Sequence, residues 1–315
     1  MDKKVKVSIL IPVYNAGKYI EKCLDSVFGQ TYPSIEFVIV DNCSTDNSLT
    51  ILSEKISQYG LSQDDCKIIR HERNEGIAVS RNDLIANATG DYVLFVDSDD
   101  WIEPDMVEQL VASTSVGSVD IVGCDFFQER PDGTQLYVSE PFADNCHDNM
   151  IKALDYEISS VLWKLLVKRT LFDNIHFTPH LDIVEDYIVT IKLYQHASSF
   201  AAVHKGLYHY IIYQDSTSNK RLNSINSHIK GVSIVEDYLK QEKLYNAEIE
   251  KKLLLRKFNI KSNFLTKSLL DYNAYRQTFP EANSMWRKMN YSLREQFKFW
   301  LAEHNLFFLL KLIQT

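Results

Sequence analysis

The stretch that decides the fold is Asp91-Tyr92-Val93-Leu94-Phe95-Val96-Asp97-Ser98-Asp99-Asp100-Trp101. Residues 92–96 are five consecutive apolar or aromatic residues, a run typical of a strand buried on both faces of a parallel sheet. Three carboxylates follow this run within four positions. Because ligands of open α/β sheets bind just outside the carboxyl ends of the strands, the stretch predicts a binding site where this strand ends.

The three carboxylates, Asp97, Asp99 and Asp100, repel one another unless a cation lies among them. Carboxylate oxygens are hard ligands, and they favour Mg²⁺ or Mn²⁺. An alternative is a solvent-exposed turn with an Asp helix cap, because Glu103-Pro104 is typical of a helix start. A helix cap needs only one Asp, so three carboxylates favour the cation site.

A strand-helix alternation extends from this stretch toward the N-terminus, with a spacing of roughly 30 residues per unit. The alternation predicts an α/β protein with a mostly parallel sheet flanked by helices. The predicted strands cover residues 7–15 (broken at Pro12), 35–40, 66–71 and 92–96, and the predicted helices cover residues 19–28, 48–59, 77–87 and 104–113.

The pattern changes after residue 118 and becomes wholly helical from Gly231 onward. Arg130-Pro131-Asp132-Gly133 is typical of a hairpin turn. We expect two domains, residues 1–217 and a helical region 218–315. The intermediate predictions are a strand at 119–127 returning near Val138, an apolar segment at 160–172, a helix from 183 to about 196, strand-like stretches at 200–203 and 206–213, and a polar connector at 218–229.

Charge is unevenly distributed along the 315 residues, whose formal net charge is −8. This negative balance argues against a general nucleic-acid binder, which needs a basic face. Residues 230–315 hold 15 Lys and Arg against 9 Asp and Glu, while residues 1–229 hold 19 against 33. A basic tail behind an acidic body indicates a separate role for the tail.

The last segment, residues 297–313, is apolar and aromatic with few charges. Such a segment packs in a core, joins copies of the chain in a homo-oligomer, or lies on a membrane surface. We find no signal peptide and no window of ~18 apolar residues that would span a bilayer. The five cysteines lack CxxC spacing, which disfavours zinc and disulfides. We therefore expect a cytoplasmic protein, which is peripheral at the inner face of the membrane if this segment lies on the membrane surface.

Polar loops follow three of the predicted strands, at Tyr14-Asn15, 41–46 and 97–100. In a parallel sheet these loops meet at one edge. Tyr14 is suited to stack on a nucleobase, and Asp41 can accept a base imide N–H, which favours uracil or thymine. Arg81 is suited to a bidentate phosphate contact. Each residue alone could be an ordinary loop residue, but their convergence predicts a nucleotide site.

These segments resemble family 2 glycosyltransferases, the large inverting group with the GT-A fold. The resemblance is specific over residues 7–105, extends more weakly to about residue 215, and ends before residue 230. The matching segments are Val7-Ser8-Ile9-Leu10-Ile11-Pro12-Val13-Tyr14-Asn15, Gln30-Thr31-Tyr32-Pro33, Val38-Ile39-Val40-Asp41-Asn42-Cys43-Ser44-Thr45-Asp46, Asn74-Glu75-Gly76, Ser80-Arg81-Asn82, Ala88-Thr89-Gly90-Asp91-Tyr92, Phe95-Val96-Asp97-Ser98-Asp99-Asp100, Trp163-Lys164 and Glu185-Asp186.

The resemblance implies a nucleotide-diphosphate sugar as donor, and Asp41 favours a UDP-sugar. It also implies that Asp99, with Asp97, binds Mn²⁺ or Mg²⁺, and that Asp186 is the catalytic base, with Glu185 as the alternative. His204 is a weaker metal candidate, because a lone His is more often structural. The positions that match nucleotide-sugar binding are Pro12, Tyr14, Asn15, Asp41, Arg81, Asp97 and Ser98.

Processive members of this family often carry a Gln-x-x-Arg-Trp motif, which is missing from this sequence. Transfer of a single sugar to a hydroxyl of a glycan or glycolipid is therefore expected, as in the synthesis of bacterial surface polysaccharide. A sugar nucleotidyltransferase and an inactive nucleotide-sugar-binding protein are the alternatives. The loop at residues 14–18 has a single Gly and does not form a phosphate cradle, which argues against the nucleotidyltransferase.

Overall fold

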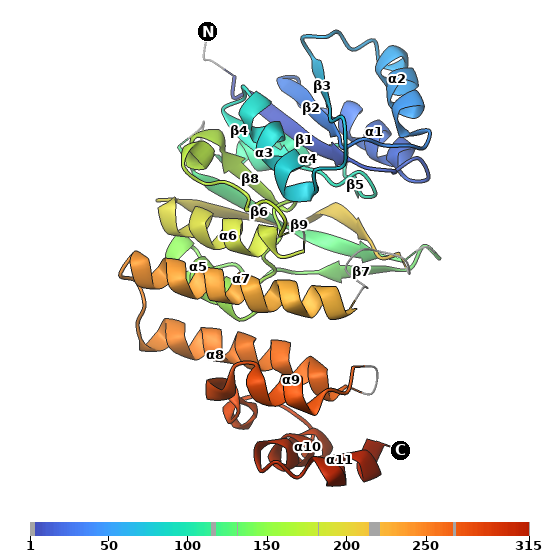
Figure 1. The fold of residues 1–315 in the computed structure, drawn as a ribbon. Helices are drawn as coiled ribbons and strands as arrows, with labels where there is room; N and C mark the ends of the chain where they lie inside the picture. The colour runs from blue at the N-terminus through green and yellow to red at the C-terminus, as the bar shows by residue number, and fades with distance from the viewer. Residues whose placement is uncertain are drawn as a thin grey trace. The chain divides into compact units, whose positions relative to one another are not determined.

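The computed structural model describes residues 4–114, 118–130, 132–181, 183–213, 221–266 and 269–314. The chain divides into two compact units (Figure 1). The N-terminal unit comprises Met1–Ala153 and Glu157–Ser216, and the C-terminal unit comprises Leu154–Tyr156 and Thr217–Thr315.

The N-terminal unit is built on a nine-stranded sheet with the order β3-β2-β1-β4-β8-β6-β9-β5, in which β7 pairs with β6. The strands β3, β2, β1 and β4 run parallel to one another. Every residue of β1 is buried, as expected for a central strand covered on both faces. The strands are β1 (Val7–Val13), β2 (Ile35–Asp41), β3 (Cys66–Arg70), β4 (Tyr92–Phe95), β5 (Trp101–Ile102), β6 (Ile121–Glu129), β7 (Gln135–Val138), β8 (Leu165–Lys168) and β9 (Phe200–Ile211).

Helices connect and flank these strands, which confirms the predicted α/β class. Helix α3 packs on β1 and β2, and α1 packs on α2 and β5. The sequence did not reveal α5 or the two-residue strand β5. The helices are α1 (Ile20–Phe28), α2 (Ser48–Gln58), α3 (Ile77–Asn87), α4 (Met106–Ala112), α5 (Cys146–Leu154) and α6 (Glu185–His196).

The predicted break at Pro12 is wrong, because β1 continues through it to Val13. The carbonyl of Val13 accepts from Asn42 N at 2.8 Å on the β2 side, and the carbonyl of Leu10 accepts from Val96 N at 3.0 Å on the β4 side. Backbone groups of alternate residues face the same neighbour, so Pro12 faces the β4 side like Leu10. The pairing of β1 with β4 ends at Leu10. The missing N–H of Pro12 therefore leaves no gap in the ladder.

The second half of the sheet contains antiparallel pairs, β4 with β8, β6 with β8, β6 with β7, and β5 with β9. The predicted hairpin turn is confirmed by the β6–β7 pairing, although Pro131 lies outside the described residues. The two stretches predicted at 200–203 and 206–213 are a single strand, β9. It pairs with β6 through register shifts on either side of Asp125, and a bulge of this kind interrupts the alternating pattern without ending the strand.

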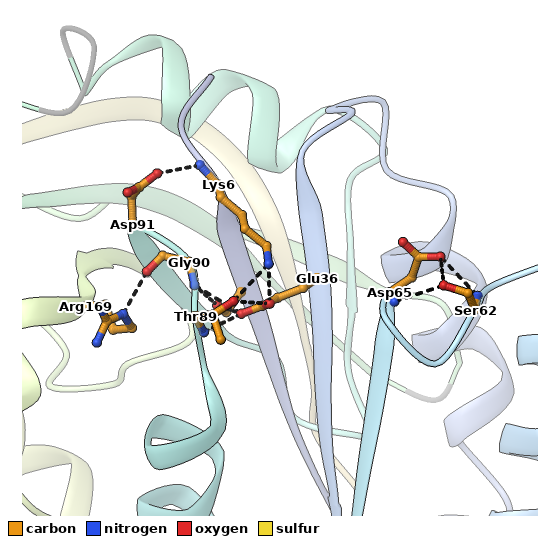
Figure 2. Close-up of polar contacts among 9 residues, drawn as sticks. Lys6, Glu36, Ser62, Asp65, Thr89, Gly90, Asp91 and Arg169 are labelled. Atoms are coloured by element: carbon orange, nitrogen blue, oxygen red, sulfur yellow. Dashed lines mark hydrogen bonds and ion pairs between the residues drawn. The ribbon is translucent and has the colours of Figure 1, made fainter. Parts of the chain in front are cut away.

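A buried carboxylate ties the strands together near the start of β1 and β2 (Figure 2). Glu36 accepts hydrogen bonds from Lys6 Nζ, Ser8 Oγ, Thr89 N and Thr89 Oγ1, each at 2.5 Å, and from Gly90 N at 3.1 Å. Burial alone would raise the pKa of Glu36, but the hydrogen bonds from Lys6, Ser8 and Thr89 outweigh it and lower the pKa to about 2. We call these five residues the Glu36 cluster.

Within its described residues, the C-terminal unit consists of helices and the turns that join them. Helix α7 begins at Arg221, so the predicted polar connector is wrong from residue 221 onward, and residues 218–220 lie outside the described part. Ile225 and Val232, seven residues apart, are both buried, which gives α7 an apolar face. The helices are α7 (Arg221–Gln241), α8 (Ala247–Ser262), α9 (Tyr272–Gln277), α10 (Leu293–Glu303) and α11 (Phe307–Gln314).

The apolar final segment, predicted as one stretch, forms two helices, α10 and α11. Asn305 has a left-handed φ of 58°, and Leu306 N donates to Leu301 O at 2.8 Å. This pattern ends a helix with a left-handed C′ residue, a position where Asn is tolerated. No helix within the described ranges is both long enough and apolar enough to cross a bilayer. All five cysteines are free thiols.

Candidate functional site

The loops after β1 and β2 are joined at the carboxyl edge of the sheet. Asn15 Oδ1 accepts from Thr45 N at 2.8 Å, and Ser44 Oγ accepts from Asn15 N at 3.0 Å. Asp41 is buried, and its Oδ1 accepts from Ser44 N at 3.1 Å. Tyr14 is 50% exposed, which leaves its ring open to a ligand. The structure thus brings these predicted nucleotide-binding residues together, next to the buried Pro12 of β1.

Arg81 on α3 forms hydrogen bonds with carboxylates from two distant parts of the chain. Its Nη2 donates to Asp97 Oδ1 at 3.2 Å, at the end of β4. Its Nη1 donates to Glu185 Oε1 at 2.9 Å and also to Asp186 Oδ1, both at the start of α6. The predicted metal-binding loop and the predicted catalytic pair therefore meet at one guanidinium. We call Arg81, Asp97, Glu185 and Asp186 the Arg81 cluster.

The Arg81 cluster holds one cation against three carboxylates in a buried setting. Burial would lower the pKa of Arg81, but the charges of Asp97 and Glu185 outweigh it and raise the pKa above its usual value. Burial raises the pKa of Glu185, and Arg81 offsets only part of that effect. Within the described part of the chain, Arg81 Nε and Glu185 Oε2 are buried without a hydrogen-bond partner. The cluster is therefore incomplete as it stands.

Asp99 and Asp100 follow Asp97 but have different surroundings. Asp100 Oδ1 accepts from Ile211 N and its Oδ2 from Tyr208 Oη, each at 2.8 Å, so Asp100 is tied to β9. Burial and then the charge of Asp97 raise the pKa of Asp99 to about 6. Of the three carboxylates, Asp97 pairs with Arg81 and Asp100 is tied to β9, whereas the charged form of Asp99, beyond the half-buried Ser98, is disfavoured.

The residues present fit a divalent cation held by two carboxylates. No group of three or more His, Cys, Asp or Glu side chains in the described ranges is placed to hold a metal ion. Mg²⁺, however, is usually held by one or two carboxylates and completes its shell with waters and substrate phosphates. The raised pKa of Asp99 marks a position where a nearby positive charge would be favourable.

His204 is not brought to these carboxylates. It lies on β9 with a 61% exposed side chain, and its Nδ1 is 3.6 Å from Asp125 Oδ2. Ile211, whose N–H binds Asp100, is seven residues further along the strand, or roughly 20 Å at the usual rise per residue. The structure therefore gives no support to His204 as a metal ligand.

The two candidates for the catalytic base differ in solvent exposure. The side chain of Asp186 is 16% exposed and that of Glu185 only 7%. Leu162 N donates to Asp186 Oδ2 at 3.3 Å, which fixes the carboxylate beside the segment that leads into β8. Both residues lie in the first turn of α6, where negative charge is favoured.

Tyr208 is a residue of this site that the sequence did not reveal. Its hydroxyl donates to Asp100 Oδ2 and accepts from Asp97 N at 3.1 Å. Trp163, one half of the Trp163-Lys164 match, stacks on Tyr208 with ring centroids 4.2 Å apart. Nothing local marks Tyr208, because Leu207-Tyr208-His209-Tyr210 is an ordinary strand sequence.

Solved structures share this fold. Residues 1–349 of Staphylococcus aureus TarS in complex with UDP match with a TM-score of 0.68 and 23% identity, covering 89% of this chain and 83% of that one. The mannosyltransferase PcManGT of Pyrobaculum calidifontis, in complex with GDP-Man and Mn²⁺, matches with a TM-score of 0.55 and 16% identity, covering 99% of this chain and 84% of that one.

Sequence comparison identifies the family. EpsH of Bacillus subtilis (strain 168) is 33% identical over 218 residues, which are 67% of this chain and 62% of EpsH. The match therefore spans less than two thirds of that relative. The family model described as glycosyl transferase family 2 matches residues 8–181, more than half of the chain. The resemblance inferred from the motifs is thus confirmed, and the chain belongs to glycosyl transferase family 2.

Proposed function

We propose that this protein is an inverting, metal-dependent glycosyltransferase that moves one sugar from a UDP-sugar to a hydroxyl of a glycan or glycolipid acceptor. The observation that supports the proposal is the Arg81 cluster, in which one guanidinium contacts both Asp97, which we assign to the donor side, and Asp186, which we assign to the acceptor side. A donor-binding group and a base that lie together can act on the two sides of one anomeric carbon.

On the donor side, Asp41 and Tyr14 bind the uracil, and Asn15 fixes the loop between them. TarS, which shares the fold, was solved with UDP, and that complex supports the choice of nucleotide. Asp97 and Asp99 hold Mn²⁺ or Mg²⁺, and PcManGT was solved with Mn²⁺. Bound there, the cation would offset the negative charge that builds up on the diphosphate leaving group.

On the acceptor side, Asp186 takes the proton from the acceptor hydroxyl. The hydroxyl oxygen forms a bond to the anomeric carbon as the bond from that carbon to the diphosphate oxygen breaks. Attack from the opposite face inverts the configuration in a single displacement. A carboxylate base of this kind typically contributes 10²–10⁴-fold to the rate.

The test uses the full-length protein with Mn²⁺ and a panel of UDP-, GDP- and dTDP-sugars, with nucleotide release as the readout. We expect UDP release, a loss of turnover with retained donor binding in Asp186→Asn, and a loss of Mn²⁺-dependent donor binding in Asp99→Ala. Asp64→Asn, which changes an exposed carboxylate before β3, is the matched control. Pyrophosphate release would indicate a nucleotidyltransferase instead, and unchanged donor affinity in Asp99→Ala would refute the metal assignment.

We also propose that the C-terminal unit contacts an anionic membrane surface, where a glycolipid acceptor would lie. Leu293, Phe297 and Trp300 of α10 are 84%, 51% and 39% exposed, and their spacing places them on one helical face. Exposed aromatic residues in a basic region are typical of helices that lie in a membrane interface. The basic excess of residues 230–315 complements an anionic surface.

Co-sedimentation with phosphatidylglycerol vesicles tests the membrane proposal. Binding should weaken with added salt and should be lost in the double variant Phe297→Ser, Trp300→Ser. Phosphatidylcholine vesicles are the control. A full-length protein that does not sediment with anionic vesicles would refute the proposal, as would a dimer in solution that the same double variant dissociates.

A further inference from the structure

His71 joins two elements of the candidate nucleotide site. It follows β3, and its backbone N donates to Asp41 O at 2.9 Å. Its ring Nδ1 lies 2.9 Å from Asn42 Oδ1, and its ring Nε2 lies 2.9 Å from Asp83 Oδ2 on α3. The side chain of His71 is only 10% exposed. One residue thus contacts the end of β2 by its backbone and links that end to α3 through its ring.

The contacts around Asn42 determine which atom donates and which accepts in each hydrogen bond. Asn42 Oδ1 accepts from Glu75 N at 2.9 Å, and Asn74 Oδ1 accepts from Gly76 N at 3.0 Å. A backbone N–H can only donate, so these two contacts fix which amide atom is oxygen in each Asn. Asn42 Nδ2 then donates to Asn74 Oδ1 at 2.9 Å. The ring of His71 must therefore donate to Asn42, because a carbonyl oxygen cannot.

The second ring nitrogen lies against the carboxylate of Asp83. The rigid ring of His71 therefore spans the distance between Asn42 and Asp83. A shorter or more flexible side chain would not hold Asn42 and Asp83 at these two distances at once. The ring fixes Asn42, and Asn42 in turn fixes the turn at residues 74–76 through Glu75 and Asn74.

This turn has a backbone conformation that needs support. Gly76 has φ 86° and ψ 162°, a region that other residues avoid, and it immediately precedes α3. Arg81 lies five residues further along the same helix. The direction in which α3 leaves the turn therefore affects the position of Arg81. A turn released from Asn42 would sample more conformations, and a ligand would have to order it on binding.

We propose that His71 is a positioning residue for the donor nucleotide. It holds Asp41, through its backbone, and the start of α3, through Asn42, in the geometry that binds the nucleotide. The inference rests on the proposed use of a UDP-sugar. It goes beyond that proposal, because it assigns a function to a residue outside the proposed nucleotide-binding and catalytic residues.

The test compares two substitutions on either side of the ring. His71→Ala removes both ring contacts, and we expect the KM for the UDP-sugar and the Kd for UDP with Mn²⁺ each to rise about tenfold while kcat stays within about threefold. Asp83→Ala, at a 42% exposed side chain, should raise both constants less. Asp83→Asn keeps a polar partner for Nε2 and should restore the wild-type values. His204→Ala, which removes an exposed His of β9, is the matched control.

The outcomes separate this inference from the proposed function. A wild type that does not bind UDP would overturn the donor proposal and this inference with it. If the wild type binds UDP and both His71→Ala and Asp83→Ala bind it with the wild-type affinity, the positioning role alone would be overturned. A fall in kcat at unchanged KM would overturn it too. If His71→Ala does not fold, the comparison of UDP affinity in Asp83→Ala and Asp83→Asn still tests the positioning role. Both variants should fold, because the Asp83 side chain is partly exposed.

Discussion

The N-terminal unit contains two ionic clusters with opposite balances of charge and hydrogen-bond donors. The Glu36 cluster, near the start of β1 and β2, surrounds one carboxylate with donors from Lys6, Thr89 and Gly90 (Figure 2) and from Ser8. The Arg81 cluster, beyond the carboxyl end of β4, surrounds one guanidinium with three carboxylates. The first has an excess of donors and the second an excess of negative charge.

The pKa shifts follow this difference. The pKa of Glu36 falls to about 2, because its donors favour the charged form despite its burial. The pKa of Glu185 rises because of its burial, and that of Asp99, beside the Arg81 cluster, rises to about 6. A cluster that favours its charges stabilises the fold, whereas one that disfavours them lowers stability and gains from a bound cation. Such unfavourable arrangements are typical of functional sites.

The largest expected effect follows from Arg81→Ala, which leaves three carboxylates facing one another. Removing one partner of a buried ion pair costs about 3–5 kcal/mol of stability. UDP release should fall by at least about 100-fold, because donor and acceptor residues lose their shared contact. Urea unfolding and the release assay measure the two effects.

Arg81→Lys serves as the comparison for this variant, because it keeps the charge but not the forked geometry. Its free energy of unfolding and its rate of UDP release should both lie between those of the wild type and those of Arg81→Ala. Wild-type activity in Arg81→Ala would show that the Arg81 cluster does not organise the site.

The next largest effect should come from Glu36→Gln, and on stability alone. The pKa of Glu36 falls from its ordinary 4.5 to about 2, which corresponds to about 3 kcal/mol. Because the folded-state pKa is lowered, this stabilisation is complete above pH 4.5 and is lost as the pH falls toward 2. The unfolding free energies of Glu36→Gln and the wild type should therefore differ at pH 7 and converge near pH 2.

The KM for the donor should not change in Glu36→Gln, because the residue lies at the far end of the strands from the proposed site. Glu54→Gln, at an exposed position of α2, controls for the loss of a carboxylate. A gap between Glu36→Gln and the wild type that persists unchanged at pH 2 would contradict the assigned cause of the pKa shift.

The sequence indicated one of these clusters much better than the other. Asp97 and Asp99 could be predicted because they end an apolar run, which is a local pattern, and the family motifs added Arg81 and Asp186. Nothing in the sequence indicated the role of Glu36, since a lone Glu in Ile35-Glu36-Phe37-Val38 is typical of a residue that faces solvent. Its donors come from segments 28 to 54 residues away in the chain.

Tertiary structure also distinguishes residues that the sequence presents as equivalent. Asp99 and Asp100 are adjacent carboxylates, but only Asp100 accepts from Ile211 N, 111 residues away. His71 and Tyr208 likewise acquire their roles from partners in other elements of the chain. The predicted strand break at Pro12 was wrong because Pro12 lies beyond Leu10, where the pairing of β1 with β4 ends. The residue at which two strands stop pairing depends on their register, which composition does not reveal.

A smaller effect, of opposite sign, is expected for Asp99→Asn. Burial and the charge of Asp97 disfavour the charged form of Asp99 and raise its pKa from 3.8 to about 6, so a neutral side chain should stabilise the protein in EDTA by up to about 3 kcal/mol at pH 7. The same variant should lose the stabilisation that Mn²⁺ and UDP together give to the wild type. Thermal melts with and without Mn²⁺ and UDP measure both, with Asp64→Asn as the control. Destabilisation in EDTA would show that Asp99 is structural.

The smallest effect concerns Lys6, the only fully charged donor of the Glu36 cluster. Its contact with Glu36 is short at 2.5 Å, but its side chain is 40% exposed, so water screens the pair. Lys6→Met should therefore cost less than about 1 kcal/mol, well below Glu36→Gln. The reason is that Ser8 Oγ, Thr89 N and Thr89 Oγ1 remain to satisfy the carboxylate. If Lys6→Met proved as costly as Glu36→Gln in urea unfolding, the cluster would be held by its ion pair and would differ from the Arg81 cluster only in charge. If Lys6→Met costs little, neutral donors in fixed geometry stabilise the buried charge of Glu36. In the Arg81 cluster, by contrast, three carboxylates share one guanidinium, and this difference distinguishes the candidate site from the scaffold.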